Sequence, residues 1–101
     1  LGEAGAEAFV VPAAWPQPRV GHWRLLGRAR ALENQCVMVQ CNSAGTHHDT
    51  VMGGHSQIVD ATGEVLTELA HGEEGVLTAS IDLSATTAYR RAFPVLDDRR
   101  L

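Results

Sequence analysis

The spacing of apolar residues changes along the chain, and each change predicts a different element. An uninterrupted apolar run over residues 8–14 is typical of a central strand covered on both faces. Pro12 has no N–H to donate, so we expect regular pairing to end near it and a loop to occupy residues 15–18. From His22 to Gln35 the apolar residues recur at helical spacing. The stripe of this predicted helix comprises Leu25, Ala29, Leu32 and Cys36, widened by Trp23 and Leu26.

A second, nearly continuous apolar run over residues 36–41 predicts another buried strand. Strand, helix and strand in this order form a crossover unit, which favours parallel pairing of the two strands. The polar, turn-rich residues 42–50 predict a surface loop, which Gly53 and Gly54 close.

The last third of the chain reads as a series of strands followed by a helix. Residues 55–60 and 65–69 predict a hairpin around the turn Asp60-Ala61-Thr62-Gly63, where Gly supplies a positive φ. Alternation over residues 77–81 predicts a half-buried strand. Ser84 is the expected cap of a short final helix that reaches Arg91.

These elements predict an α/β fold in which helices flank a mixed sheet. A length of 101 residues allows one domain at most, covering residues 1–101. The first residues contain no initiator Met and resemble the end of a helix that runs into a strand. We therefore expect the chain to begin inside a fold, as an incomplete domain.

Composition narrows the classes of partner. Hydrophobic residues make up 45% and charged residues 20% of the chain, as in ordinary folded proteins. The net charge is -4 and no lysine is present, so nucleic acid is a poor candidate partner. No apolar run has the length of a membrane span, and the N-terminus lacks the pattern of a signal peptide. A cytoplasmic location without membrane attachment is the resulting expectation.

Single residues suggest several kinds of chemistry, but none has a supporting motif. His47, His48, Asp49 and His55 form a histidine-rich cluster without the spacing of a zinc site, so we predict no metal and no other cofactor. Cys41 could be a nucleophile, although a cysteine in an apolar strand is more often a small core residue. Gly54-His55-Ser56 lacks the second glycine of a serine hydrolase elbow.

A family resemblance emerges from longer segments. The predicted helix ends in Ala29-Arg30-Ala31-Leu32-Glu33-Asn34, and the following strand leads into Asn42-Ser43-Ala44-Gly45. Upstream stands Val11-Pro12-Ala13-Ala14-Trp15-Pro16, and downstream Gly54-His55-Ser56-Gln57-Ile58-Val59-Asp60. In this order the segments resemble the C-terminal part of the nitrilase superfamily of carbon–nitrogen hydrolases. Trp15-Pro16 and residues 91–100 resemble its ω-amidase and YafV-like branch.

The resemblance implies the C-terminal part of an α-β-β-α sandwich and a hydrolase of amides, nitriles or carbamoyl compounds. Members of the family use a Glu, Lys and Cys set, in which the cysteine forms a thioester. Neither Cys36 nor Cys41 matches the nucleophile and no lysine is available. We therefore expect no catalytic residue in this chain, which would be inactive alone.

Other roles follow from the same resemblance. Ala13, Ala14, Trp15, Asn42 and Ser43 would form part of the wall of a pocket for a small amide or nitrile. The helix His22–Gln35 would be a candidate interface in a homo-oligomer, although its stripe fits equally well against the chain's own sheet. A non-catalytic α/β interaction module is the alternative function.

Overall fold

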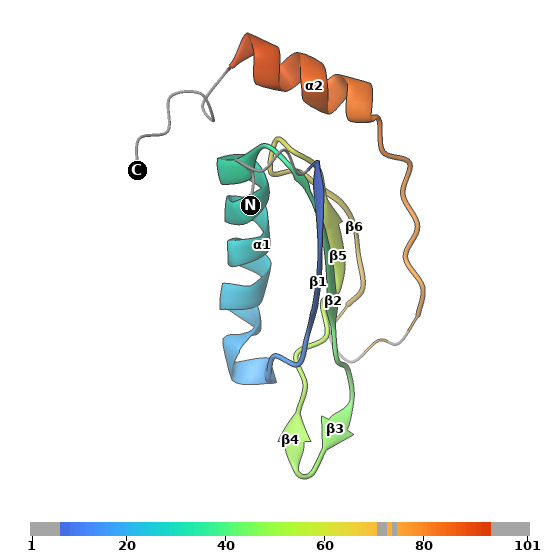
Figure 1. Cartoon of the computed structure of the whole chain (residues 1–101). Coiled ribbons are helices and arrows are strands. Elements are labelled where there is room, and N and C mark those ends of the chain that lie inside the picture. Colours follow the sequence, from blue (N-terminus) through green and yellow to red (C-terminus); the bar gives the residue numbers. More distant parts are fainter. Residues whose placement is uncertain (1–6, 71–72, 74, 94–101) are drawn as a thin grey trace.

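A computed structural model describes residues 7–70, 73 and 75–93 of the chain. Two layers are prominent in Figure 1, a helix and the sheet that it covers. The sheet has four strands in the order β1-β2-β5-β6. The elements are β1 (Ala8–Ala13), a 3-10 turn (Gln17–Arg19), α1 (Val20–Asn34), β2 (Val37–Asn42), β3 (Thr46–His47), β4 (Thr50–Val51), β5 (Gln57–Val59), β6 (Val65–Glu68) and α2 (Leu83–Ala92).

The crossover from β1 through α1 to β2 has the predicted parallel pairing, with Ala8 opposite Val37 and Ala13 opposite Asn42. β5 and β6 add antiparallel strands, so the sheet is mixed as expected. The prediction of a central first strand is wrong for this sheet, because β1 lies at its edge and leaves Val10 70% exposed. The edge position also explains why Pro12 stays inside the strand, since its missing donor faces no partner there.

Helix α1 covers one face of the sheet with a different stripe from the predicted one. Trp23, Gly27 and Ala31, spaced four residues apart, are its buried residues. The larger apolar residues Leu25 and Leu32 are 64% and 50% exposed. The helical period identified the helix, but apolar residues form two narrow rows on it. The row that contains the small residues Gly27 and Ala31 faces the sheet, because small side chains allow the closer approach.

The other face of the sheet is only partly covered. Residues 75–82 run alongside it as an extended segment, and α2 then crosses beyond the strand ends (Figure 1). The predicted strand over residues 77–81 is wrong, because this segment forms no ladder with any described strand. Alternation specifies which side chains could be buried, but a strand also needs a neighbouring edge to pair with.

The final helix is present, with a different cap from the expected one. Asp82 rather than Ser84 is the N-cap, and its carboxylate accepts from the backbone N–H groups of Ser84 and Ala85. Arg90 then anchors α2 to the end of α1, where its Nε donates to the Gln35 carbonyl at 3.0 Å. Residues 94–101, which include most of the segment 91–100 that resembles the ω-amidase branch, lie outside the described residues.

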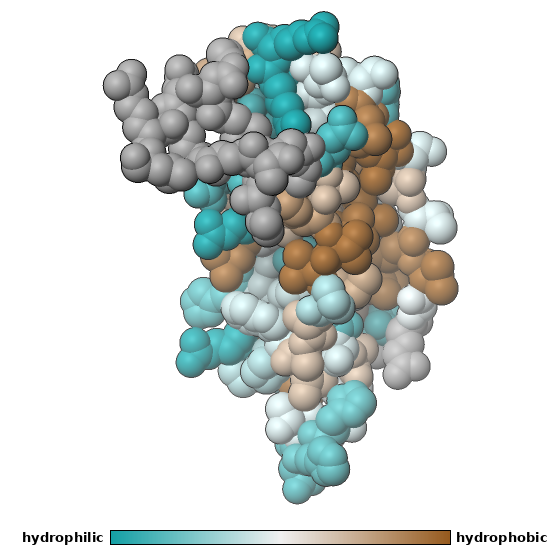
Figure 2. Space-filling view, in the orientation of Figure 1, coloured by the Kyte–Doolittle hydropathy of each residue, from teal (hydrophilic) through white to brown (hydrophobic). Residues whose placement is uncertain are grey.

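A small hairpin replaces the predicted loop over residues 42–50. β3 and β4 pair as an antiparallel ribbon, with His48 and Asp49 at the tip in the left-handed region. The ribbon projects away from the sheet and its tip is hydrophilic, whereas hydrophobic residues gather over the sheet (Figures 1 and 2). Sequence signals favoured a loop because the usual Asn-Gly pair of such a turn is missing. The predicted hairpin of β5 and β6 around Asp60–Gly63 is confirmed.

Candidate functional site

The five residues predicted to form a pocket wall meet where the parallel strands β1 and β2 end. This end of the sheet, at Ala13 and Asn42, is its carboxyl edge. Ala13 and Asn42 are the paired last residues of the parallel strands β1 and β2. Ala14, Trp15 and Ser43 follow directly after these strand ends. In α/β sheets, ligands collect at the carboxyl ends of parallel strands. The structure therefore brings all five together at this end of the sheet, and their role as a pocket wall stays a prediction.

The side chain of Asn42 links two loops at this edge. Its Oδ1 accepts a hydrogen bond from the Trp15 backbone N–H at 2.7 Å. Its Nδ2 donates to the Trp15 carbonyl at 3.2 Å and to the Gly54 carbonyl at 2.9 Å. The Asn42 side chain thus supplies the hydrogen bonds that the β1–β2 ladder no longer provides beyond Ala13.

Further hydrogen bonds close the same edge. The backbone N–H of Ser43 donates to the Ala13 carbonyl at 3.2 Å, and its own carbonyl accepts from the Gly54 N–H at 3.0 Å. The Ser56 hydroxyl accepts from the Asn42 N–H at 2.9 Å and donates to the Asn42 carbonyl at 3.3 Å. Sequence reasoning did not assign Ser56 to the site. The signal that could have found it is the Gly-x-Ser segment already noted in the hairpin motif.

Trp15 is half-buried and stands beside a second indole. The ring centroids of Trp15 and Trp23 are 5.9 Å apart and the planes meet at 45°, a favourable tilted arrangement. The indole N–H of Trp23 donates to the His55 carbonyl at 3.0 Å, which ties α1 to the start of β5. Trp15 therefore contacts the core on one side and keeps part of its surface at the carboxyl edge.

A polar pocket of about 320 Å³ opens beside this edge. Asn42 and Ser43 line it, whereas Ala13, Ala14 and Trp15 do not. Its other lining residues are Ala44, His47, Ser56, Leu69, Glu73 and Gly75. The five predicted residues are therefore neighbours at the edge of the sheet, and only two of them share this pocket.

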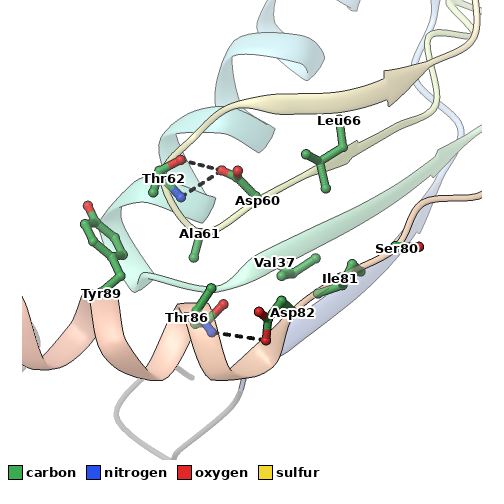
Figure 3. Close-up of a pocket in the computed structure, with 11 residues that line it drawn as sticks. Val37, Asp60, Ala61, Thr62, Leu66, Ser80, Ile81, Asp82, Thr86 and Tyr89 are labelled. Atoms are coloured by element: carbon green, nitrogen blue, oxygen red, sulfur yellow. Dashed lines mark hydrogen bonds between the residues drawn. The ribbon is translucent and has the colours of Figure 1, made fainter.

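A second pocket, of about 200 Å³, lies between the β5–β6 turn and α2 (Figure 3). Its floor is apolar and includes Val37 and Ala61. Both of its carboxylates serve the fold, since Asp60 accepts from Thr62 and Asp82 caps α2. Its other polar lining groups are the hydroxyls of Thr62, Ser80, Thr86 and Tyr89. The pocket adjoins the amino end of β2 at Val37, so the carboxyl edge is the better candidate site.

The histidines do not converge. His55 pairs its Nδ1 with Glu68 at 3.2 Å, and the same carboxylate binds Arg24 through two hydrogen bonds. His47 lies on the exposed ribbon, with its Nε2 at 3.3 Å from the Ala44 carbonyl. In the described part of the chain, no three side chains of metal-binding type come together. Nor is any helix of that part long and apolar enough to cross a membrane.

The prediction of a buried position holds for Cys36 and is wrong for Cys41. Cys41, predicted to be a small core residue, is exposed, and Cys36 is completely buried. Burial raises the pKa of the Cys36 thiol above its ordinary value, and the adjacent Arg90 guanidinium opposes this shift. The environment of Cys36 therefore disfavours the thiolate that a nucleophile requires.

The burial of Cys36 predicts a pH dependence of stability. The folded state holds the Cys36 proton more tightly than the unfolded state does. This contribution to stability is therefore present below about pH 8.5 and is lost as the pH rises beyond it. We expect urea midpoints to fall between pH 8 and pH 10 by more in the wild type than in Cys36→Ala. Equal falls in the two proteins would contradict the prediction.

The chain is similar in sequence to known carbon–nitrogen hydrolases. The family model of carbon–nitrogen hydrolases matches residues 1–91. A 2-oxoglutaramate amidase of Paenarthrobacter nicotinovorans is 49% identical over 99% of this chain and 34% of its own length. A 2-oxoglutaramate amidase of Bacillus subtilis is 45% identical over 95% of this chain and 37% of its own.

A solved structure agrees with the sequence relatives. It is a CN-hydrolase superfamily protein from Xanthomonas campestris with an arsenic adduct in its active site. It superimposes with a TM-score of 0.88 at 30% identity, over 94% of this chain and 36% of the other. The chain thus spans only about a third of the length of the relatives it matches.

The order of the matched segments, the α/β architecture with its mixed sheet and the family match agree with one another, and the chain belongs to the carbon–nitrogen hydrolase family.

Proposed function

We propose that this chain is the C-terminal part of an amidase, an enzyme that hydrolyses the carbon–nitrogen bond of a small, non-peptide amide. The observation that carries the proposal is 49% identity to a 2-oxoglutaramate amidase over 99% of the chain. A small ω-amide of an oxo acid is accordingly the first substrate to test. A nitrile substrate has no comparable support among these relatives.

The reaction of the family explains what this chain would contribute. A cysteine thiolate attacks the amide carbon, ammonia or an amine departs, and water then hydrolyses the thioester to the acid. The Glu, Lys and Cys of this scheme would come from residues outside the chain. The chain would supply scaffold and part of the pocket wall, through Ala13, Ala14, Trp15, Asn42 and Ser43 at the carboxyl edge.

Exposed apolar surface supports the view that other polypeptide completes the domain. Val10 on β1 is 70% exposed. Val76, beside the sheet face that α1 does not cover, is 89% exposed. β1 also has an unpaired edge in the described sheet. Apolar strand edges of this kind are aggregation hazards unless something covers them.

A chimera tests the proposal. The matching C-terminal third of the Bacillus subtilis relative is replaced by this chain, and release of ammonia from 2-oxoglutaramate is measured. We expect turnover by the chimera, none by this chain alone, and none by a chimera whose nucleophilic cysteine is replaced by alanine. A folded chimera without amidase activity, beside an active parent enzyme, would contradict the proposal.

The alternative, a non-catalytic α/β interaction module, predicts a different result. Such a module would fold by itself and would fail to restore activity in the chimera. Gel filtration and circular dichroism of the isolated chain, together with the chimera assay, separate the two functions. A cytoplasmic location belongs to the amidase proposal and is tested by fractionating cells that produce the protein.

We further propose a homo-oligomer in which α1 forms the interface. With Trp23 and Gly27 turned to the sheet, the opposite face of the helix presents Leu25, Ala29 and Leu32 to solvent. Leu25→Glu should reduce the molar mass in sedimentation, because a charge would be buried at the interface. Val51→Glu, at a 41% exposed position on the ribbon, is the control. An unchanged mass of the Leu25 variant would argue against this interface.

A further inference from the structure

We infer that Asn42 is a positioning residue, whose side chain fixes the backbone of Trp15 and thereby sets where the Trp15 ring stands. The effect on Trp15 follows from the hydrogen bonds of Asn42. The effect on catalysis rests in addition on the proposed function.

The position of Asn42 explains why a side chain is needed here. The parallel ladder of β1 and β2 ends with the pair Ala13 and Asn42. Two residues further on, the N–H and carbonyl of Trp15 have no strand partner, and both bind the Asn42 amide, at 2.7 and 3.2 Å. The amide therefore imitates one more step of the ladder and holds Trp15 in line with the sheet.

The hydrogen-bonding capacity of Asn42 argues against direct contact with a ligand. A carboxamide has two N–H donors and two acceptor positions. The donors go to the carbonyls of Trp15 and Gly54, and one acceptor position receives the Trp15 N–H. Only one acceptor position is left for any other partner. Asn42 thus acts on the site chiefly through Trp15 and Gly54.

Close packing around Trp15 transmits this position to its ring. The Trp15 carbonyl also receives the Gly53 N–H at 2.8 Å. A Cβ added at Gly53 would lie 3.0 Å from Val20 and 3.2 Å from this carbonyl, so only glycine allows the approach without displacement. With the backbone held from two sides and the Trp23 ring tilted beside its own, Trp15 has one defined place at the edge.

Acrylamide quenching of tryptophan fluorescence tests the inference. Trp23 is only 3% exposed, so the quenchable emission comes from the half-buried Trp15. We expect Asn42→Ala to increase quenching and to weaken the near-UV signal of the Trp15–Trp23 pair, with unchanged far-UV circular dichroism. Asn42→Asp should behave like Asn42→Ala. A carboxylate still accepts from the Trp15 N–H, but it cannot donate to the carbonyls of Trp15 and Gly54 and repels them.

Ser56→Ala is the matched control for quenching. It removes hydrogen bonds to the backbone of the same Asn42 residue but leaves the side-chain amide in place. We expect quenching to stay at the wild-type level. An equal rise of quenching in the Ser56 and Asn42 variants would show general loosening of the carboxyl edge. Unchanged quenching in Asn42→Ala would show that the position of Trp15 does not depend on the Asn42 amide. Either result would overturn the inference.

The amidase chimera supplies the catalytic readout. A misplacement of about 1 Å at a substrate-positioning group costs on the order of 100-fold in rate, and we expect a loss of kcat/KM of that order in Asn42→Ala. Asn34→Ala, which removes one exposed bond to the Arg30 carbonyl, should be close to wild type. An inactive wild-type chimera would contradict the proposed function but not the quenching result. An active chimera that tolerates Asn42→Ala would contradict the catalytic part of the inference.

Discussion

Replacing Trp23 by alanine is expected to destabilise the protein by about 4 kcal/mol, a typical cost of deleting a buried large aromatic side chain. Trp23 is 3% exposed and packs against Trp15. Its indole N–H also donates to the carbonyl of His55, which stands in the left-handed region with a φ of 52°. The substitution would therefore leave a cavity under α1 and remove a bond that holds this uncommon backbone conformation.

Urea denaturation measures this effect, and two variants separate its causes. Trp23→Phe keeps most of the ring but cannot bond His55, so we expect a loss of about 1–2 kcal/mol. Val51→Ala, at a 41% exposed position on the β3–β4 ribbon and away from α1, should change stability by less than about 0.5 kcal/mol. A Trp23→Ala loss no larger than that of Val51→Ala would refute the assigned packing of α1.

The second large effect is expected from Gly27→Ala, which should destabilise by about 2 kcal/mol although alanine is the better helix former. A Cβ at Gly27 would overlap the side-chain amide of Gln40. Gln40 is buried, donates to the Trp23 carbonyl at 3.2 Å and accepts from the Gln57 amide, so moving it aside breaks these bonds. Overpacking of about 1–3 kcal/mol and the lost bonds outweigh the helix-propensity gain of about 1 kcal/mol.

Gly21→Ala provides the control on the same helix. A Cβ there meets nothing within 4 Å, so the propensity gain of up to about 1 kcal/mol should appear as increased stability. Thermal unfolding of both variants measures the opposite signs. Stabilisation by both substitutions would mean that Gln40 can move without cost, and the close contact between α1 and β2 would then have no structural importance.

The order and type of most elements were predictable from local patterns. The apolar run at residues 8–14, the helical period from His22 and the run at residues 36–41 correspond to β1, α1 and β2 in their parallel arrangement. The Asp60–Gly63 turn chemistry likewise located the hairpin of β5 and β6. These predictions succeed because period, turn residues and crossover length are local properties of the chain.

The failures concern relations between distant segments. The outward stripe of Leu25 and Leu32 looked like a core stripe, because periodicity cannot tell which of two apolar rows meets the sheet. The strand predicted at residues 77–81 finds no ladder in the described sheet. The exposure of Cys41 was missed for the same reason, since nothing local to it specifies what covers its face of the sheet.

The candidate site shows the same division. The family motifs singled out Ala13, Trp15 and Asn42, and the register of the parallel strands brings them together. Only the tertiary structure reveals that the Asn42 amide binds the backbone of Trp15 and Gly54 rather than pointing at a ligand. The sequence does not specify the hydrogen-bond partners of an amide side chain, which for Asn42 lie 27 and 12 residues away.

By itself, the sequence determined the family, the α/β class and the succession of strand, helix and strand, because these depend on short motifs and on the period of apolar residues. The tertiary structure decided which helix face is buried, which strand is at the edge and what Asn42 holds. These depend on contacts between residues far apart in the chain, where packing and hydrogen-bond geometry, rather than local preference, select the arrangement.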